Sequence, residues 1–162
     1  MTANFSAIGG IKIQNALGDG LLILEEVELA KKLSELGHRF PNARAKYIVN
    51  ARIHKDSIKE TLGSIKTDEE KRIWLAENVK GLGFKEASHF LRNIGHNNVA
   101  IIDFHIVDLL ARHGLIEKPK TITPKKYIEI EDILRKISKI TRTNMGELDL
   151  YLWYEETGKV LK

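Results

Sequence analysis

The chain has 162 residues, about the length of one domain, and 43% of them are hydrophobic, enough for one packed core. The net charge of +4 and the pI near 9.2 allow a nucleic-acid partner without requiring one. Cysteine is absent, which excludes disulfides, thiolate catalysis, Cys-ligated zinc and cysteine-held iron–sulfur clusters. No apolar run approaches the roughly 20 residues that span a bilayer, and the first residues lack a signal-peptide pattern. We therefore expect a cytoplasmic protein with no membrane partner.

Helical periodicity runs through most of the chain and predicts an all-α fold in a single domain, residues 1–162. Thr67 and Glu70 have the spacing of a capping box and mark one helix start. The apolar stretch 99–102 is the best candidate for a strand. Glycine stops, capping residues and prolines place about nine helices, at 7–17, 24–36, 41–53, 57–65, 67–79, 85–95, 103–114, 124–142 and 145–156.

A Gly-x-Gly turn, Gly81-Leu82-Gly83, separates two of these helices and is typical of a helix–hairpin–helix, here about 68–94. Glycines let another molecule approach the backbone closely, and the free N–H groups of the new helix point outward. Such a turn is suited to holding a DNA phosphate without reading the base sequence. An ordinary turn between two helices with glycine stops is the alternative interpretation of this stretch.

Two residues near this hairpin are candidates for chemistry. Lys85 lies in the first turn of the helix after the hairpin, where the helix dipole disfavours a cation. A nucleophilic lysine would gain from that place, because only the neutral amine attacks. Asp103 follows the apolar stretch 99–102 and starts a helix, so one of its oxygens can cap the helix while the other faces a site. A solvated lysine and a simple N-cap are the alternatives.

Lys85 in G-L-G-F-K, followed 18 residues later by Asp103 in I-I-D-x-H-I, resembles the pattern of the helix–hairpin–helix DNA glycosylases. The chain is more narrowly similar to the archaeal-type 8-oxoguanine DNA glycosylase/AP lyase family. Four segments carry that resemblance: T-A-N-F-S-A-I-G-G-I-K-I-Q (2–14), G-H-R-F (37–40), R-A-K-Y-I-V (44–49) and K-G-L-G-F-K-E-A-S-H-F-L-R-N-I-G (80–95).

The resemblance implies a DNA-repair enzyme that excises 8-oxoguanine from double-stranded DNA and then nicks the strand. Lys85 would attack the sugar and form a Schiff base, β-elimination would follow, and Asp103 would stabilise the positive charge. Gly81 and Gly83 would hold the DNA backbone. Phe40 and Trp153 would stack on the flipped base, and the terminal carboxylate of Lys162 would accept a hydrogen bond from its N7–H. Core packing is the alternative for both aromatic residues, and a solvated tail is the alternative for Lys162.

The resemblance implies no cofactor and no metal, and we expect a monomer associated with the nucleoid. The six histidines show no spacing that suggests a metal site. Two features depart from the family pattern: Phe104 stands where members generally carry Arg, and the usual N-terminal segment is missing ahead of Met1. A non-catalytic helix–hairpin–helix module that binds DNA is the alternative function, and a helical interaction domain is a third.

Overall fold

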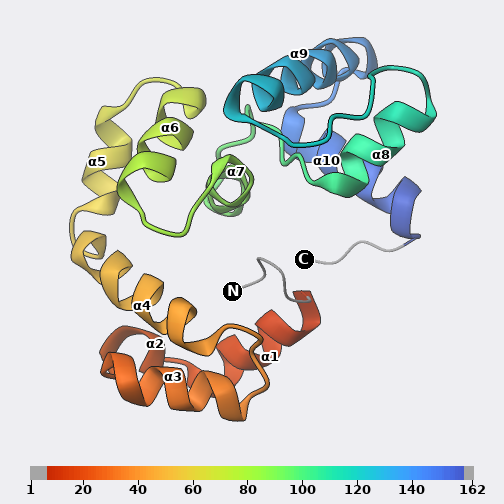
Figure 1. The fold of residues 1–162 in the computed structure, drawn as a ribbon. Helices are drawn as coiled ribbons and strands as arrows, with labels where there is room; N and C mark the ends of the chain where they lie inside the picture. Colours follow the sequence, from red (N-terminus) through yellow and green to blue (C-terminus); the bar gives the residue numbers. More distant parts are fainter. Residues whose placement is uncertain (1–6, 159–162) are drawn as a thin grey trace. The chain divides into compact units, whose positions relative to one another are not determined.

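The structure is a computed structural model that describes residues 7–158 of the chain. Within this range it contains ten α-helices, one short 3-10 helix and no strand (Figure 1), which confirms the all-α prediction. The strand prediction for 99–102 is wrong, because this segment is an irregular connection. Its apolar side chains are buried beneath helices, and burial alone produces the same short apolar run as a core strand.

The chain divides into two compact units. The first comprises the chain up to Ser64 together with Val79–Gly81, and the second comprises Ile65–Asn78 and the chain from Leu82 onward. The prediction of a single domain over 1–162 stays a prediction.

The first unit is built from five α-helices and the 3-10 helix. The four-residue α2 is absent from the sequence prediction, because so short a helix contains no repeat of the 3.6-residue period. The core of the first unit contains Ile13, Leu29, Leu33 and Ala45, which are all fully buried. The elements are α1 (Ala7–Leu17), α2 (Gly20–Ile23), α3 (Glu26–Glu35), α4 (Pro41–Ala51), η1 (Arg52–His54) and α5 (Ile58–Ser64).

The second unit holds five helices, and their ends match the sequence signals well. The capping box at the start of α6 is confirmed: the Glu70 N–H donates to Thr67 Oγ1 at 3.2 Å, and the Thr67 N–H donates to Glu70 Oε2 at 3.1 Å. Thr123 caps the long α9 directly ahead of its first-turn proline. The helices are α6 (Asp68–Asn78), α7 (Phe84–Asn93), α8 (Phe104–Arg112), α9 (Pro124–Thr141) and α10 (Met145–Thr157).

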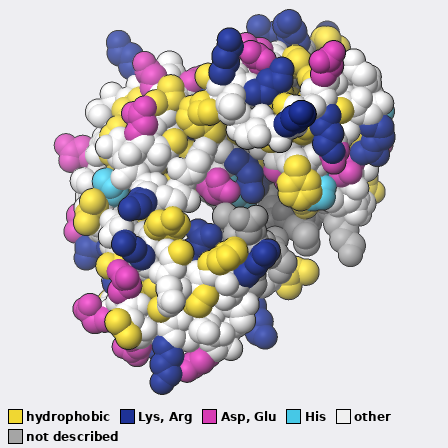
Figure 2. All heavy atoms as spheres, in the orientation of Figure 1, with side chains coloured by type: hydrophobic (Ala, Val, Ile, Leu, Met, Phe, Trp, Pro, Cys, Tyr) yellow, Lys and Arg dark blue, Asp and Glu magenta, His cyan; other side chains and the backbone are white. Residues whose placement is uncertain are grey.

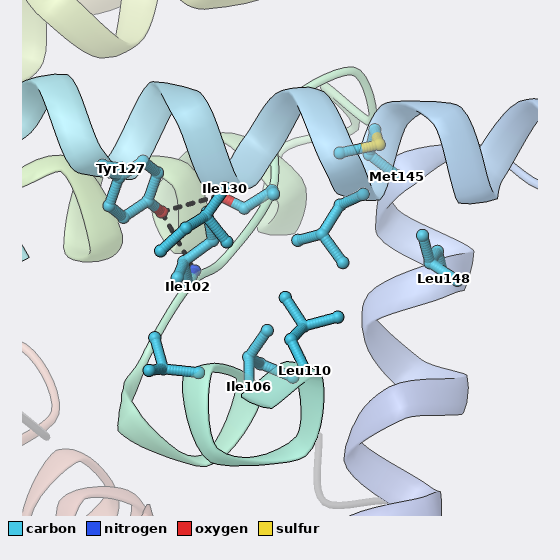
Figure 3. Close-up of a cluster of buried hydrophobic side chains, with 10 residues drawn as sticks. Ile102, Ile106, Leu110, Tyr127, Ile130, Met145 and Leu148 are labelled. Carbon is cyan, nitrogen blue, oxygen red and sulfur yellow. Dashed lines mark hydrogen bonds between the residues drawn. The ribbon is translucent and has the colours of Figure 1, made fainter. Parts of the chain in front are cut away.

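The core of the second unit lies among α8, α9, α10 and the irregular connection that leads into α8. Figure 3 shows Ile106 and Leu110 of α8 facing the side chains of α9 and α10, with Ile102 of the connection beside Tyr127. This packing fixes the path of residues 100–102, directly ahead of Asp103. The buried cluster comprises Ala100, Ile102, Ile106, Val107, Leu110, Tyr127, Ile130, Leu134, Met145 and Leu148.

The start of α10 is attached to the connection that follows α7. The backbone N–H groups of Met145 and Gly146 both donate to the Asn97 carbonyl, at 3.0 and 3.3 Å. A Cβ on Gly146 would lie 2.6 Å from Asn97 Oδ1, so the two segments approach as closely as a glycine permits. The start of α10 is therefore held against a loop about 50 residues earlier in the chain.

On the face shown in Figure 2, Lys and Arg side chains alternate with acidic and apolar ones and, among the residues drawn in colour, form no continuous basic surface. This mixture agrees with the small net charge. Between residues 7 and 158, no helix combines the length and the apolar character needed to cross a membrane.

Candidate active site and DNA-binding hairpin

The turn between α6 and α7 contains two glycines with different local geometry. Gly81 has φ +93°, and a Cβ there would lie 2.5 Å from a ring carbon of Tyr47. Gly83 is the N-cap of α7 with φ −97°, and a Cβ there would meet only Glu86 Oε2, at 3.4 Å. The fold itself therefore requires glycine at 81. At Gly83 the fold leaves room for a methyl group, so only an approaching partner would require glycine there.

Lys85 lies one residue into α7, in its first turn. Its side chain is 36% exposed, and its Nζ is 3.4 Å from Glu86 Oε1. Gly83 provides no side-chain cap, so the first-turn N–H groups are left without the usual oxygen acceptor from the N-cap residue. The amine is thus partly accessible and lies beside a helix start that suits an anion.

Asp103 is the N-cap of α8, as predicted, and its Oδ1 accepts a hydrogen bond from the Ile106 N–H at 3.1 Å. The capping bond fixes one carboxylate oxygen. The side chain is half-buried and follows the packed 100–102 segment directly. Asp103 is therefore held at its backbone and at one oxygen.

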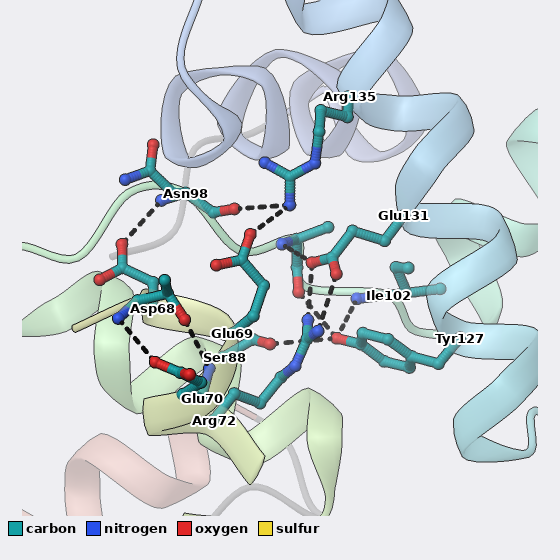
Figure 4. A network of polar contacts seen from close by, with 12 residues as sticks. Asp68, Glu69, Glu70, Arg72, Ser88, Asn98, Ile102, Tyr127, Glu131 and Arg135 are labelled. Carbon is teal, nitrogen blue, oxygen red and sulfur yellow. Dashed lines mark hydrogen bonds and ion pairs between the residues drawn. The ribbon is translucent and has the colours of Figure 1, made fainter. Parts of the chain in front are cut away.

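Tyr127 of α9 connects the segments that carry these two residues (Figure 4). Its hydroxyl donates to the Ala100 carbonyl at 2.7 Å and accepts from the Ile102 N–H at 3.0 Å. Its ring packs edge-on against the Phe84 ring, with centroids 5.6 Å apart. Phe84 directly precedes Lys85, and Ile102 directly precedes Asp103. One side chain thus sets the spacing between the starts of α7 and α8.

A buried ion pair between Arg72 and Glu131 lies beside Tyr127. The Arg72 guanidinium of α6 donates to both oxygens of Glu131, at 2.6 and 2.8 Å, and Glu131 also accepts from the Ala100 N–H at 2.6 Å. The Arg72 Cζ also lies 5.0 Å from the centroid of the Phe84 ring and 5.3 Å from that of the Tyr127 ring. Both charges are almost fully buried, so each needs the other to offset the free-energy cost of its removal from water.

Sequence reasoning missed the roles of Tyr127, Arg72 and Glu131. One signal was available: Glu131 lies within the apolar stripe of α9, where a carboxylate requires a buried partner. The identity of that partner, 59 residues away in α6, leaves no pattern in the sequence.

His89 lies one turn after Lys85, on the same face of α7. Burial lowers the pKa of His89 below its ordinary value of 6.5, and the positive charges of Arg92 and Lys85 lower it further, against a smaller opposing effect of Glu86. The imidazole is therefore neutral at pH 7. A neutral imidazole beside Lys85 adds no positive charge to the site.

The lowered pKa of His89 gives the protein a stability that depends on pH. Below about pH 6.5 the unfolded chain binds a proton at this histidine that the folded protein resists, so stability falls as the pH decreases. We expect urea unfolding at pH 5.5 and pH 7.5 to show a smaller loss of stability for His89→Gln than for wild type. His113→Gln, at an exposed position, is the control. A His89 signal that titrates at or above 6.5 by NMR would contradict this prediction.

The residues predicted to recognise the base lie in different parts of the chain. Phe40 belongs to the first unit, is 43% exposed, and has the Arg39 guanidinium 5.1 Å from its ring centroid. Its backbone N–H donates to Nδ1 of the buried His38 at 3.1 Å. Trp153 of α10, in the second unit, packs edge-on against His105, with ring centroids 5.5 Å apart, and its buried Nε1 has no hydrogen-bond partner among residues 7–158. Lys162 lies outside the described residues.

No group of three or more His, Asp or Glu side chains suited to a metal ion occurs among residues 7–158. The described site offers the Lys85 amine, the Asp103 carboxylate and the first N–H groups of α7.

Comparisons with known proteins identify the family of this chain. A family model described as 8-oxoguanine DNA glycosylase matches residues 1–143. A relative from Korarchaeum cryptofilum, named 8-oxoguanine DNA glycosylase/AP lyase, is 57% identical over all of this chain and 78% of its own length. A relative of the same name from Methanocaldococcus jannaschii is 52% identical over the same shares.

Solved structures give the same result. The crystal structure of the M. jannaschii 8-oxoguanine glycosylase/lyase in complex with 15mer DNA containing 8-oxoguanine is 52% identical, with a TM-score of 0.94 over 99% of this chain and 78% of that one. The 8-oxoguanine DNA glycosylase of Thermotoga maritima is 46% identical, with a TM-score of 0.91 over 99% of this chain and 77% of that one. This chain belongs to the 8-oxoguanine DNA glycosylase family, with its helix–hairpin–helix fold.

Proposed function

We propose that this chain is a bifunctional DNA-repair enzyme that excises 8-oxoguanine from double-stranded DNA and nicks the strand at the resulting abasic site. The family membership and the M. jannaschii relative crystallised with 8-oxoguanine DNA support the substrate. The enzyme acts as a monomer in the cell, at the nucleoid, and it needs no cofactor for either step.

Lys85 is the nucleophile of the proposed reaction. Its neutral amine forms a bond to C1′ of the sugar while the C1′–N9 bond breaks, and the base leaves with the bonding electrons and is protonated. The sugar ring opens to a Schiff base on Nζ. Loss of a C2′ proton then expels the 3′ phosphate and cuts the strand. Asp103 stabilises the positive charge on the sugar in the first step and assists the proton transfers.

The observation that carries this proposal is the Tyr127 contact with both segments. Lys85 and Asp103 are 18 residues apart, and each directly follows a residue that touches Tyr127. An amine and a carboxylate that must act on one sugar carbon require a fixed spacing, because a displacement of about 1 Å reduces catalysis strongly. A module that only binds DNA has no such need.

The hairpin and three further residues would hold the DNA in this scheme. Gly81 and Gly83 bring the backbone of the turn to a phosphate, and the first N–H groups of α7 donate to it. Phe40 and Trp153 stack on the flipped base, and the carboxylate of Lys162 accepts from N7–H, which 8-oxoguanine has and guanine lacks.

Borohydride trapping tests the proposed function. The protein is incubated with duplex DNA containing one 8-oxoguanine and then reduced, which converts a Schiff base into a stable adduct. We expect an adduct of protein plus one cut strand with this DNA and none with the matched guanine duplex. Binding to both duplexes without an adduct would instead indicate the non-catalytic DNA-binding module.

Substitutions at the two hairpin glycines distinguish a role in the fold from a role in DNA binding. We expect Gly81→Ala to lower the free energy of unfolding by about 1–3 kcal/mol, because of the positive φ and the Tyr47 ring. Gly83→Ala should unfold like wild type and bind duplex DNA roughly tenfold more weakly, if a phosphate approaches this backbone closely. Urea unfolding and fluorescence anisotropy measure the two effects. Unchanged DNA affinity in Gly83→Ala would remove Gly83 from the proposed interface.

A further inference from the structure

We propose that Asp149 of α10 and Arg92 of α7 form a positioning pair for Asp103, so that Asp149 is a further determinant of the excision rate. The proposal rests on the proposed function, in which Asp103 stabilises the positive charge on the sugar. Asp149 and Arg92 belong neither to the glycine turn of the hairpin nor to the residues proposed to recognise the base.

The pair joins the two helices that carry the proposed nucleophile and one proposed base-stacking residue. The Arg92 guanidinium donates to Asp149 Oδ2, and the two side chains are only 16% and 12% exposed. Arg92 lies seven residues after Lys85, on the same face of α7. Asp149 lies four residues before Trp153, on the same face of α10. The ion pair therefore links the Lys85 face of α7 to the Trp153 face of α10.

Asp149 also lies beside the start of α8. It lines a small cavity together with Ile101 and Ile106. Ile101 lies two residues before Asp103, and the Ile106 N–H donates the capping hydrogen bond to the Asp103 carboxylate. Among the described residues, Asp103 is the only other carboxylate whose charge shifts the pKa of Asp149, and Arg92 is the only cation that does so. The third helix at the cavity, α9, contributes the apolar Leu134. Asp149 thus binds one charged group from α7 and lies within electrostatic range of another at the start of α8.

The electrostatics agree with this placement. Burial raises the pKa of Asp149 to about 6, Arg92 opposes the rise, and the negative charge of Asp103 adds to it. At pH 8 Asp149 is charged, holds Arg92, and adds its negative field to that of Asp103. As the pH falls through about 6, Asp149 takes up a proton, and the ion pair becomes a hydrogen bond between the charged Arg92 guanidinium and a neutral carboxyl group.

A second ion pair on α10 provides a matched control. Arg112, in the last turn of α8, pairs with Glu156 of α10, and these side chains are 58% and 18% exposed. This pair also joins α10 to a neighbouring helix through an arginine and a carboxylate. It lies at the opposite end of α8 from Asp103, so Glu156→Gln removes an α10 carboxylate without touching the site.

The test measures single-turnover excision of 8-oxoguanine by wild type, Asp149→Asn and Glu156→Gln at pH 8 and pH 5. We expect Asp149→Asn to be about tenfold slower than wild type at pH 8, and only about twofold slower at pH 5, where wild-type Asp149 is itself protonated. The ratio cancels other groups that titrate in both proteins. Glu156→Gln should match wild type at both pH values. A ratio for Asp149→Asn that is the same at both pH values would mean a structural role and would overturn the proposal.

A second measurement does not depend on activity. The Asp149 carboxyl is titrated by carbon NMR in wild type and in Asp103→Asn, in which asparagine keeps the helix cap. We expect its pKa to be lower in Asp103→Asn, because the neighbouring negative charge is gone. An unchanged titration would refute the coupling, even if Asp149→Asn does not fold. Absence of excision by wild type would refute the proposed function instead, and the NMR result would still decide the coupling.

Discussion

Replacing Lys85 with Gln is expected to abolish the borohydride-trapped adduct and to reduce excision of 8-oxoguanine by about 10³-fold or more, the size typical of removing a nucleophile. Gln keeps the length and polarity of the side chain but has no amine that can form a Schiff base. The fold should be unaffected, because Lys85 is partly exposed and its pair with Glu86 is worth at most about 1 kcal/mol.

The control for this experiment is Lys139→Gln, at an exposed lysine in the last turn of α9. It should give the wild-type adduct, and both variants should have the wild-type unfolding midpoint. If an adduct persists in Lys85→Gln, another amine attacks the sugar, and the assignment of the nucleophile is wrong.

Replacing Glu131 with Gln is expected to destabilise the protein by about 3–5 kcal/mol, because it leaves the buried charge of Arg72 without a counter-charge. Gln fills nearly the same volume, so the loss reports charge and not packing. The Ala100 N–H also loses a charged acceptor at 2.6 Å. Urea unfolding measures the change in free energy, and thermal unfolding should show a clearly lower Tm.

A second pair between the same two helices is the control. Glu69 of α6 binds Arg135 of α9 at 2.7 Å, but these side chains are 39% and 32% exposed. Glu69→Gln should therefore cost no more than about 1 kcal/mol. Equal losses for the two variants would show that burial does not set the strength of these contacts and would contradict the prediction.

Local signals in the sequence were sufficient for most of the fold. The capping box at Thr67 and the proline at 124 marked helix starts that the structure contains. The failures have local causes as well. The helix α2 is too short to show a period, and the run 99–102 is apolar because helices cover it, which a strand would show equally.

The residues of the candidate site also fall into two groups: those with a local signal in the sequence and those without one. Lys85 and Asp103 were predicted from local positions at helix starts, together with the family resemblance. The sequence places Tyr127 only within the predicted helix 124–142, yet its hydroxyl reaches a backbone segment 25 residues earlier. Contacts of this kind depend on how helices pack, and a single sequence records no such pairing between distant positions.

The two hydrogen bonds from the start of α10 to the Asn97 carbonyl have a consequence for synthesis of the protein. The Asn97 carbonyl is translated well before α10, and these two donors reach it only after α10 has left the ribosome. Earlier helices can form as they emerge, since domains begin to fold from the N-terminal side during synthesis. We therefore expect the Met145 and Gly146 N–H groups to gain protection against hydrogen exchange only when α10 meets the Asn97 loop, which is made earlier.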